Sequence, residues 1–432
     1  MAIKRISLAL AFGTLSISTP VTPVTGRVIG MNQPAEPVTA ARIARLPAKD
    51  RTAWSAYLLR SQAQMSVDKA ALAAERRAGA PVPPQPATGN GEKTMPLDRD
   101  AAWYAGPEAR HVADVILSFQ TPAGGWGKNQ PRDGALRQPG QFYVSNNANP
   151  AATAGDFDAA EAWHYVGTID NDATITETRF LAKVAAALSG AAGDRYRAGA
   201  IRGLRYLLAA QYPNGGWPQV WPLEGGYHDA ITLNDNAMAQ VLTLMTDAGA
   251  GRGDLAMLPT DLKRAAAAAT ARGIACLLRM QVVVNGRKTG WGQQHDALTL
   301  RITSARNYEP AALAAPESAA ILRYLMRLQR TPTIAQAVEP GIAWLKESAI
   351  VGQAWRDAGD GQGRRLIPDP AARMLWARFY TLDGGRPIFG DRDKTLHDDV
   401  MEISPGRRRG YAWFGTGPQS ALAEYAAWSA RR

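Results

Sequence analysis

The chain has 432 residues, of which 46% are apolar and 20% charged, with 41 glycines and 28 prolines. This composition excludes a disordered or collagen-like chain and allows a large core. The single cysteine, Cys276, excludes an internal disulfide and a cysteine-rich metal fold. The net charge of +11 is concentrated near the start, because residues 1–100 hold 13 Lys and Arg against 7 Asp and Glu, which leaves 36 against 31 for the rest. So small an excess argues against a nucleic-acid-binding protein, and it is compatible with an acidic substrate.

The start of the chain combines two basic residues, Lys4-Arg5, with a mostly apolar stretch at residues 6–17. This pattern predicts a signal peptide over residues 1–26. No later segment carries about 18 uninterrupted apolar residues, so we expect no transmembrane helix and no membrane partner. We therefore expect a secreted or periplasmic protein. We also expect a monomer.

Composition divides the remainder of the chain into three parts. Residues 27–77 are expected to form a helical N-terminal segment, because apolar residues recur there at helical spacing. Residues 78–99 are rich in proline and glycine, which cannot continue a helix, and are expected to form a linker. Residues 100–432 are expected to form one catalytic domain.

Ala-rich amphipathic stretches recur through this domain and predict a mainly α architecture. They lie near residues 108–119, 174–188, 198–211, 234–247, 262–281, 315–329 and 418–429. Extended runs on either side of Asp383-Gly384-Gly385 predict a β-hairpin within residues 378–392.

Three of the helical stretches are followed by the same pattern of a glutamine, a glycine-rich turn and a tryptophan. The copies are Gln120 with Gly124-Gly125-Trp126, Gln211 with Gly215-Gly216-Trp217, and Gln281 with Gly290-Trp291. Such a repeat predicts a turn with positive φ after each helix and a tryptophan folded back against the next helix pair. Helix pairs of this kind stack into an α/α barrel or toroid, with short hairpins at its rim.

Two polar clusters stand at the heads of apolar helices, Asp170-Asn171-Asp172 and Asn234-Asp235-Asn236. Each has a purely structural interpretation: Thr174 and Glu177 fit a capping box after the first cluster, and Asn234 is a candidate N-cap in the second. The alternative is a cation site, because several hard oxygen donors within a few residues suit Ca²⁺ and do not suit zinc. Two clusters at adjacent helix heads would be able to share one cation.

Two further segments are crowded with arginines and other polar residues. One contains His295-Asp296, which is more typical of an ordinary hydrogen-bonded pair than of a catalytic base. The other runs from Arg378 to Trp413 and is either a salt-bridged loop or a guanidinium cluster that binds carboxylates. Interleaved aromatic residues fit either a carbohydrate groove or the helical core: Trp126, Trp217, Trp221, Trp291, Tyr308 and Trp413.

Taken together, these segments resemble the pectate lyases of polysaccharide lyase family ten. The resemblance covers about residues 100–432 and rests on motifs that occur in the order of the family: Gly124-Gly125-Trp126-Gly127-Lys128-Asn129, Thr168-Ile169-Asp170-Asn171, Tyr212-Pro213-Asn214-Gly215-Gly216-Trp217-Pro218-Gln219, Asn234-Asp235-Asn236-Ala237-Met238, Gln294-His295-Asp296 and Arg386-Pro387-Ile388-Phe389-Gly390-Asp391-Arg392-Asp393.

The resemblance implies Ca²⁺-dependent β-elimination of α-1,4-linked polygalacturonate or pectin oligosaccharides on an α/α toroid, giving 4,5-unsaturated products. The family's base is an arginine, and the matching position is Arg306. The implied Ca²⁺ ligands are Asp170, Asn171 and Asp235, with Asp172 as the alternative to Asp170. The residues implied or expected to bind substrate are Arg378, Arg392, Lys128, Asn129 and Tyr308.

The reaction removes the C5 proton of a galacturonate, which is α to a carboxylate whose negative charge opposes further charge development. A cation and arginines that neutralise this carboxylate stabilise the transition state. A free guanidinium has a pKa of about 12.5–13.8. We expect Ca²⁺ and neighbouring arginines to lower the pKa of Arg306, and hence an alkaline optimum.

Three alternatives to the lyase remain at this point. A glycoside hydrolase would need a carboxylate pair, such as Asp170 with Asp235 or Asp296. A non-catalytic protein that binds acidic oligosaccharides would show affinity without turnover. A structural helical repeat protein would place the arginines and the acidic clusters on opposite sides of the fold.

Overall fold

The computed structural model describes residues 27–145, 165–188, 190–383 and 385–430. The predicted signal peptide lies outside these ranges. The helices are α1 (Ala40–Ile43), α2 (Ala48–Glu75), α3 (Ala101–Ala105), α4 (Pro107–Ser118), α5 (Ile175–Ala187), α6 (Ala191–Ala210), α7 (Ala237–Ala250), α8 (Thr260–Met280), α9 (Ala315–Arg327), α10 (Pro332–Glu347), α11 (Pro405–Arg409) and α12 (Gln419–Ser429). None of the helices in the described ranges is long and apolar enough to cross a membrane.

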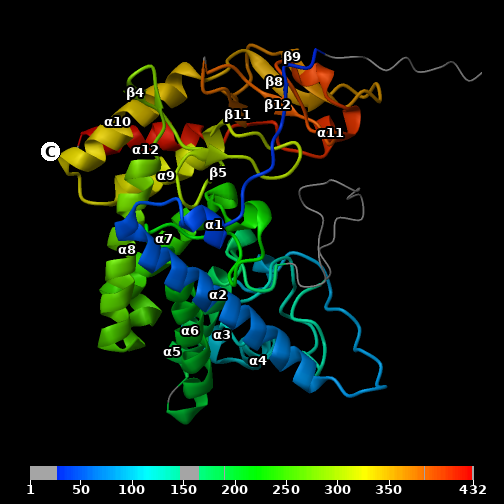
Figure 1. Ribbon diagram of the computed structural model, residues 1–432, viewed down its shortest axis with the longest axis vertical. Helices are drawn as coiled ribbons and strands as arrows, with labels where there is room; N and C mark the ends of the chain where they lie inside the picture. Colours follow the sequence, from blue (N-terminus) through cyan, green and yellow to red (C-terminus); the bar gives the residue numbers. More distant parts are fainter. Residues whose placement is uncertain (1–26, 146–164, 189, 384, 431–432) are drawn as a thin grey trace, which may run out of the picture.

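The helices pack in consecutive pairs, α5 with α6, α7 with α8, and α9 with α10, while α12 packs against α9 (Figure 1). This is the predicted mainly α architecture, an α/α toroid. Every helical stretch expected from the sequence is present. The sequence pattern missed α10, which contains an internal proline, Pro340, and begins at Pro332 behind an N-cap from Thr331.

The predicted repeat explains how each pair is joined. The Gln120 side chain donates to the carbonyl oxygens of Gly124 and Gly199, and Gln211 repeats these bonds one unit later with Gly215 and Ala269. Gly124 and Gly215 have φ of 102° and 99°, as the turn requires.

The tryptophan of each unit closes the pair. Trp126 and Trp217 donate their indole N–H groups to the carbonyls of Ile116 and Leu207 in the helix before the turn. Their rings also pack against the next helix: a Cβ at Gly203 in α6 would lie 3.0 Å from Cζ3 of Trp126. Trp376 makes the same kind of bond to Leu345 and marks a further copy that the sequence pattern did not reveal.

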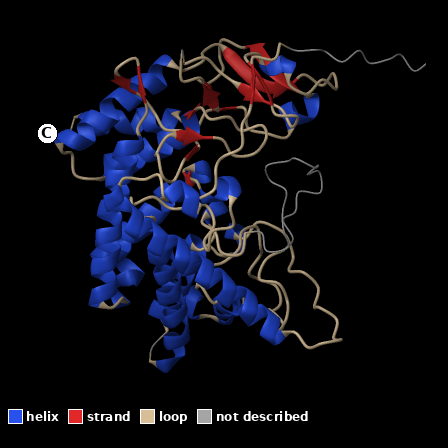
Figure 2. Ribbon diagram, in the orientation of Figure 1, coloured by secondary structure: helices blue, strands red, loops and turns tan. Residues whose placement is uncertain are grey.

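Short antiparallel sheets gather at one end of the helices (Figure 2). They are β1 (Gly30–Met31) with β13 (Thr395–His397) and β12 (Phe389–Gly390); β2 (Ile231–Thr232) with β5 (Gln294–His295) and β6 (Ile302–Thr303); β3 (Val283–Val284) with β4 (Arg287–Lys288); β7 (Leu313–Ala314) with β11 (Phe379–Tyr380); β8 (Gln353–Asp357) with β9 (Arg364–Pro368); and β10 (Trp376–Ala377) with β14 (Phe414–Gly415). The predicted hairpin within 378–392 is present but short: Thr381 donates its amide to the carbonyl of Arg386, and Ile388 donates to that of Phe379, around an antiparallel bridge from Tyr380 to Pro387. Its arms also pair with β7 and β13.

The N-terminal segment packs on the same core as the toroid. Trp54 and Tyr57 of α2 contact Tyr212, and the Tyr57 hydroxyl donates to the carbonyl of Ala210 at the end of α6. Ahead of α2, the buried Asn32 donates its side-chain amide to the carbonyls of the 306–309 loop, at 3.0–3.1 Å. The expected division into an N-terminal segment, a linker and a catalytic domain stays a prediction.

Candidate active site

The two polar clusters form tight turns at the heads of α5 and α7, at residues 170–172 and 234–236, and these turns contact each other. In both turns the second and third residues have left-handed backbone, with φ of 50° and 58° in the first and 48° and 64° in the second. Such values are costly for residues other than glycine, and they persist where the surroundings hold them, often at functional sites. The capping box of Thr174 and Glu177 fixes the first turn on α5.

The turns at residues 170–172 and 234–236 form an acidic wall, and Asp170 is the buried residue at its centre. Its Oδ2 lies 2.5 Å from Nζ of Lys128, and the Asn234 amide contacts Asp170 Oδ1 at 3.4 Å and Asp235 Oδ2 at 2.8 Å. Burial alone would raise the pKa of Asp170, but the charges of Lys128 and Arg306 hold that pKa below its usual value. Asp170 is therefore ionised at neutral pH.

Asp235 stands beside it in a less favourable setting. Burial, followed by the negative charge of Asp170, raises the pKa of Asp235. Two carboxylates and the side-chain oxygen of Asn171 form a donor set that suits Ca²⁺, and a divalent cation would relieve their repulsion. Within the described ranges no group of three or more His, Cys, Asp or Glu side chains is placed to hold a metal, so a bound Ca²⁺ would also need oxygen ligands of other kinds, from amides, water or substrate.

Arg306 lies opposite the acidic wall, in the loop that follows β6. Its Nε and Nη2 donate to the two carboxylate oxygens of Glu309 at 2.8 and 2.6 Å. The Arg306 side chain is 34% exposed, whereas that of Glu309 is 2% exposed. The Tyr411 hydroxyl donates to Glu309 at 2.6 Å and holds the carboxylate in place.

The pKa of Arg306 differs from the sequence-based expectation. Burial would lower this pKa, but the charge and hydrogen bonds of Glu309 raise it well above the usual value. The expectation considered only cationic neighbours and overlooked this carboxylate. The pKa of Arg407 is lowered, mainly by burial and to a smaller extent by the charges of Arg392 and Arg306, which outweigh the opposing effect of Tyr308.

Sequence reasoning missed Arg407, which lies in the run Arg407-Arg408-Arg409 of α11. Its guanidinium stacks over the Tyr308 ring at 4.1 Å, and its buried Nε has no hydrogen-bond partner among the described residues. The exposed Arg392, in the turn between β12 and β13, faces the same space. Three arginines thus oppose the acidic wall.

These two walls enclose one cavity of about 390 Å³. The lining includes all but one of the residues expected to act in the site: Lys128, Asn129, Asp170, Asn171, Asp235, Arg306, Tyr308 and Arg392. The acids and the arginines therefore lie on the same side of the fold, which argues against a purely structural repeat protein.

Arg378 is the exception. Its buried guanidinium donates to Glu317 at 2.6 Å and to Asn234 at 2.9 Å, and it is not among the residues that line the cavity. Its predicted contact with substrate stays a prediction.

The remaining candidates have structural surroundings. His295 is buried and hydrogen-bonds to the backbone of Gly292 and Leu300, so it does not pair with Asp296. Asp296 is paired with Arg42 at 2.6 Å instead. The suggestion that the tryptophans line a groove is wrong, because they are at most 3% exposed and belong to the core: Trp126, Trp217, Trp221, Trp291 and Trp413.

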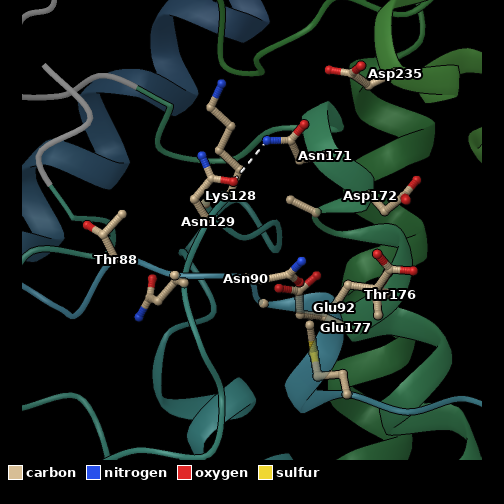
Figure 3. A pocket seen from close by; sticks show the side chains of 16 residues that line it. Thr88, Asn90, Glu92, Lys128, Asn129, Asn171, Asp172, Thr176, Glu177 and Asp235 are labelled. Atoms are coloured by element: carbon tan, nitrogen blue, oxygen red, sulfur yellow. Dashed lines mark hydrogen bonds between the residues drawn. The ribbon is translucent and has the colours of Figure 1, made fainter. Parts of the chain in front are cut away.

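A second cavity of about 570 Å³ adjoins the first and shares Lys128, Asn129, Asn171 and Asp235 with it. Figure 3 shows Asn171 donating to Asn129 at the boundary, at 2.9 Å. Asp172 lines only this second cavity. Its pKa is raised to about 6 by burial and then by Glu92 and other acidic neighbours. Asp170, not Asp172, faces Arg306.

The comparisons agree with this combination of toroid and site. The family model of the pectic acid lyases matches residues 120–422, and the chain belongs to this family. It is a polysaccharide lyase of family ten. A family 10 polysaccharide lyase from Cellvibrio cellulosa is 31% identical with a TM-score of 0.63, over 79% of this chain and 100% of its own. An aspartate-to-alanine mutant of such a lyase from the same organism, in complex with trigalacturonic acid, is 30% identical with a TM-score of 0.64, over 78% of this chain and 98% of its own. No curated protein matches the chain.

Proposed function

We propose that this chain cleaves α-1,4-linked polygalacturonate by Ca²⁺-dependent β-elimination, with Arg306 as the base. The observation that carries the proposal is that two acidic turns and three arginines line one cavity. The complex of the Cellvibrio lyase with trigalacturonic acid supports the choice of substrate.

The acidic wall is the proposed cation site. Asp170, Asp235 and Asn171 would hold Ca²⁺ together with the carboxylate of the substrate. The bound cation would neutralise that carboxylate and so make the adjacent C5 proton more acidic. Lys128 keeps Asp170 ionised and oriented for this role, through their 2.5 Å contact.

The basic wall holds the sugar and removes the proton. We propose that Arg392 and Arg407 bind substrate carboxylates by forked hydrogen bonds, and that Asn129 and Tyr308 contact the sugar. Neutral Arg306 takes the C5 proton, the C5–H electron pair forms the C4–C5 double bond, and the C4–O bond breaks. The departing oxygen takes a proton, which leaves a 4,5-unsaturated end on one product.

Glu309 has two opposing effects on this base. It stabilises the positive charge that Arg306 gains as it takes the proton, and it lowers the fraction of Arg306 that is neutral beforehand. Because the neutral fraction of Arg306 grows only at high pH, activity should rise towards alkaline pH.

A hydrolase with a carboxylate pair remains the alternative, because Asp235 has the raised pKa of a general acid and Asp170 stays ionised beside it. It gives no role to the three arginines that line the same cavity, and the lyase does. Asp296 is bound to Arg42 and is not part of the cavity lining.

The test is incubation with polygalacturonate with and without Ca²⁺, followed by ultraviolet absorbance. Absorbance that rises only with Ca²⁺ supports the proposal, whereas saturated products would indicate hydrolysis. Arg306→Lys that folds normally and keeps near-wild-type turnover would contradict the base assignment.

A further inference from the structure

The second cavity, of about 570 Å³, adjoins the catalytic cavity of about 390 Å³. The two share four lining residues, so a polymer bound at the catalytic cavity would pass beside the second. Its polar lining residues, Thr88, Asn90 and Thr176, are suitable partners for sugar hydroxyl groups (Figure 3).

The wall nearest Glu92 comes from outside the matched family region. Residues 88–92 and Met95 precede residue 120, where the family match begins. This segment is held firmly: the Gly89 amide donates to the carbonyl of Asn129 at 2.8 Å, and a Cβ on Gly91 would lie 2.8 Å from the carbonyl oxygen of Gln130. The second cavity is therefore a built feature of this chain.

The charges that face the second cavity do not balance. Among the described residues that line it, the only cation is Lys128, which is paired with Asp170, and in Figure 3 its amino group points away from Glu92. Glu177 is neutralised by the buried Arg132 at 2.9 Å.

Three carboxylates remain in that lining: Glu92, Asp172 and Asp235. Asp172 has a buried oxygen without a hydrogen-bond partner in the described part of the chain. Even with Asp235 assigned to the cation, two negative charges face the space. A galacturonate carboxylate placed there would be repelled.

We propose that the second cavity is a sugar subsite that accepts a methyl-esterified galacturonate, next to the free acid held in the catalytic cavity. Esterification is the change that removes the charge from a unit of this polymer while leaving its hydroxyl groups in place. Met95 and Ala173 add apolar surface that suits the ester methyl group. This inference rests on the proposed lyase function.

The experiment compares kcat/KM on fully de-esterified polygalacturonate with that on partly methyl-esterified pectin, for the wild type, Glu92→Gln and Glu92→Lys. Asp98→Asn is the matched control, because Asp98 is an exposed acid of the same segment that does not line the cavity. We expect Glu92→Gln to lower the ratio of esterified to de-esterified activity by roughly two- to fivefold, as removal of one exposed charge interaction allows. Glu92→Lys should lower it further, and Asp98→Asn should leave it unchanged.

Salt provides an independent readout. At about 1 M salt the Debye length falls to about 3 Å, so the wild-type ratio of esterified to de-esterified activity should fall, and that of Glu92→Gln should fall less. An unchanged ratio in both Glu92 variants would overturn the inference. So would a selective loss of polygalacturonate activity in Glu92→Gln, which would show that the acidic wall binds carboxylates through a cation. Absence of lyase activity in the wild type on both substrates would instead refute the proposed function.

Discussion

Replacing Glu309 by glutamine removes the charge that keeps Arg306 protonated. The side chain keeps its size, but a carboxamide has a single acceptor oxygen for the two guanidinium donors that now lie 2.6 and 2.8 Å from the carboxylate. Since Glu309 raises the pKa of Arg306, its loss lowers that pKa. The rising limb of the pH profile should therefore move to lower pH.

The size of the shift follows from the geometry. Two unit charges about 4 Å apart interact by about 4 kcal/mol at an effective dielectric constant of about 20. One pKa unit corresponds to about 1.4 kcal/mol, so full removal is equivalent to about three units. Because 34% of the Arg306 side chain is exposed, water in the cavity screens the pair, and we expect a shift of about one to two units.

The assay is kcat/KM on polygalacturonate, measured by ultraviolet absorbance from neutral to strongly alkaline pH. Wild-type activity should keep rising with pH, whereas Glu309→Gln should level off earlier. The matched control is Glu317→Gln, which removes an equally buried carboxylate paired with Arg378. It should not move the rising limb of the pH profile. If both variants fold, as judged by thermal unfolding, and share the wild-type profile, Arg306 is not the group whose deprotonation limits the reaction.

Four other outcomes are expected. Asn32→Ala removes a buried amide whose two N–H groups are shared among three carbonyls of the 306–309 loop. Urea titration should show a loss of about 1–3 kcal/mol of unfolding free energy, and kcat should fall. An unchanged kcat would contradict a role of Asn32 in holding this loop. Asp170→Asn and Asp235→Asn should each raise the Ca²⁺ concentration needed for half-maximal activity by about tenfold or more, measured by Ca²⁺ titration after chelation. Arg392→Ala should raise KM by about tenfold or more and change kcat less, because loss of a charge-assisted bond costs about 1.5–3 kcal/mol; an equal fall in both would indicate a role in the chemical step. The His295 imidazole should stay neutral down to about pH 4, because burial lowers its pKa, and NMR titration near the ordinary 6.5 would refute its placement.

The helices and the acidic turns were predictable because their patterns are local. A turn such as Asp170-Asn171-Asp172 at the head of an apolar helix is visible in the sequence, and the repeat of Gln120 and Trp126 indicates that successive helix heads lie side by side. The sequence therefore allowed two clusters at adjacent helix heads to share one cation, and the structure places the two turns in contact. The long helix α10 was missed because Pro340 interrupts a periodicity that the folded helix tolerates.

The basic wall was less predictable because its members come from distant segments. Arg407 lies in a run of three arginines, and only the fold selects the one that stacks on Tyr308. Glu309 was visible, three residues from Arg306, but its pairing was not inferred. An acid so close to a candidate base is a sign that could have been used, and it reverses the expected direction of the pKa shift of Arg306.

The site keeps opposite charges in one small space because its central charges are paired within each wall. Lys128 neutralises Asp170, and Glu309 neutralises Arg306, so neither pair needs to collapse across the cavity. Such pairs contribute little to stability, since desolvation offsets their attraction, but they hold the charges in fixed positions. Asp235 and Arg392 are the more exposed members of the acidic and the basic wall. They therefore remain able to bind a cation and a sugar acid, respectively. An arrangement of this kind stabilises developing charge without having to reorganise, which is the condition for lowering the barrier to proton removal.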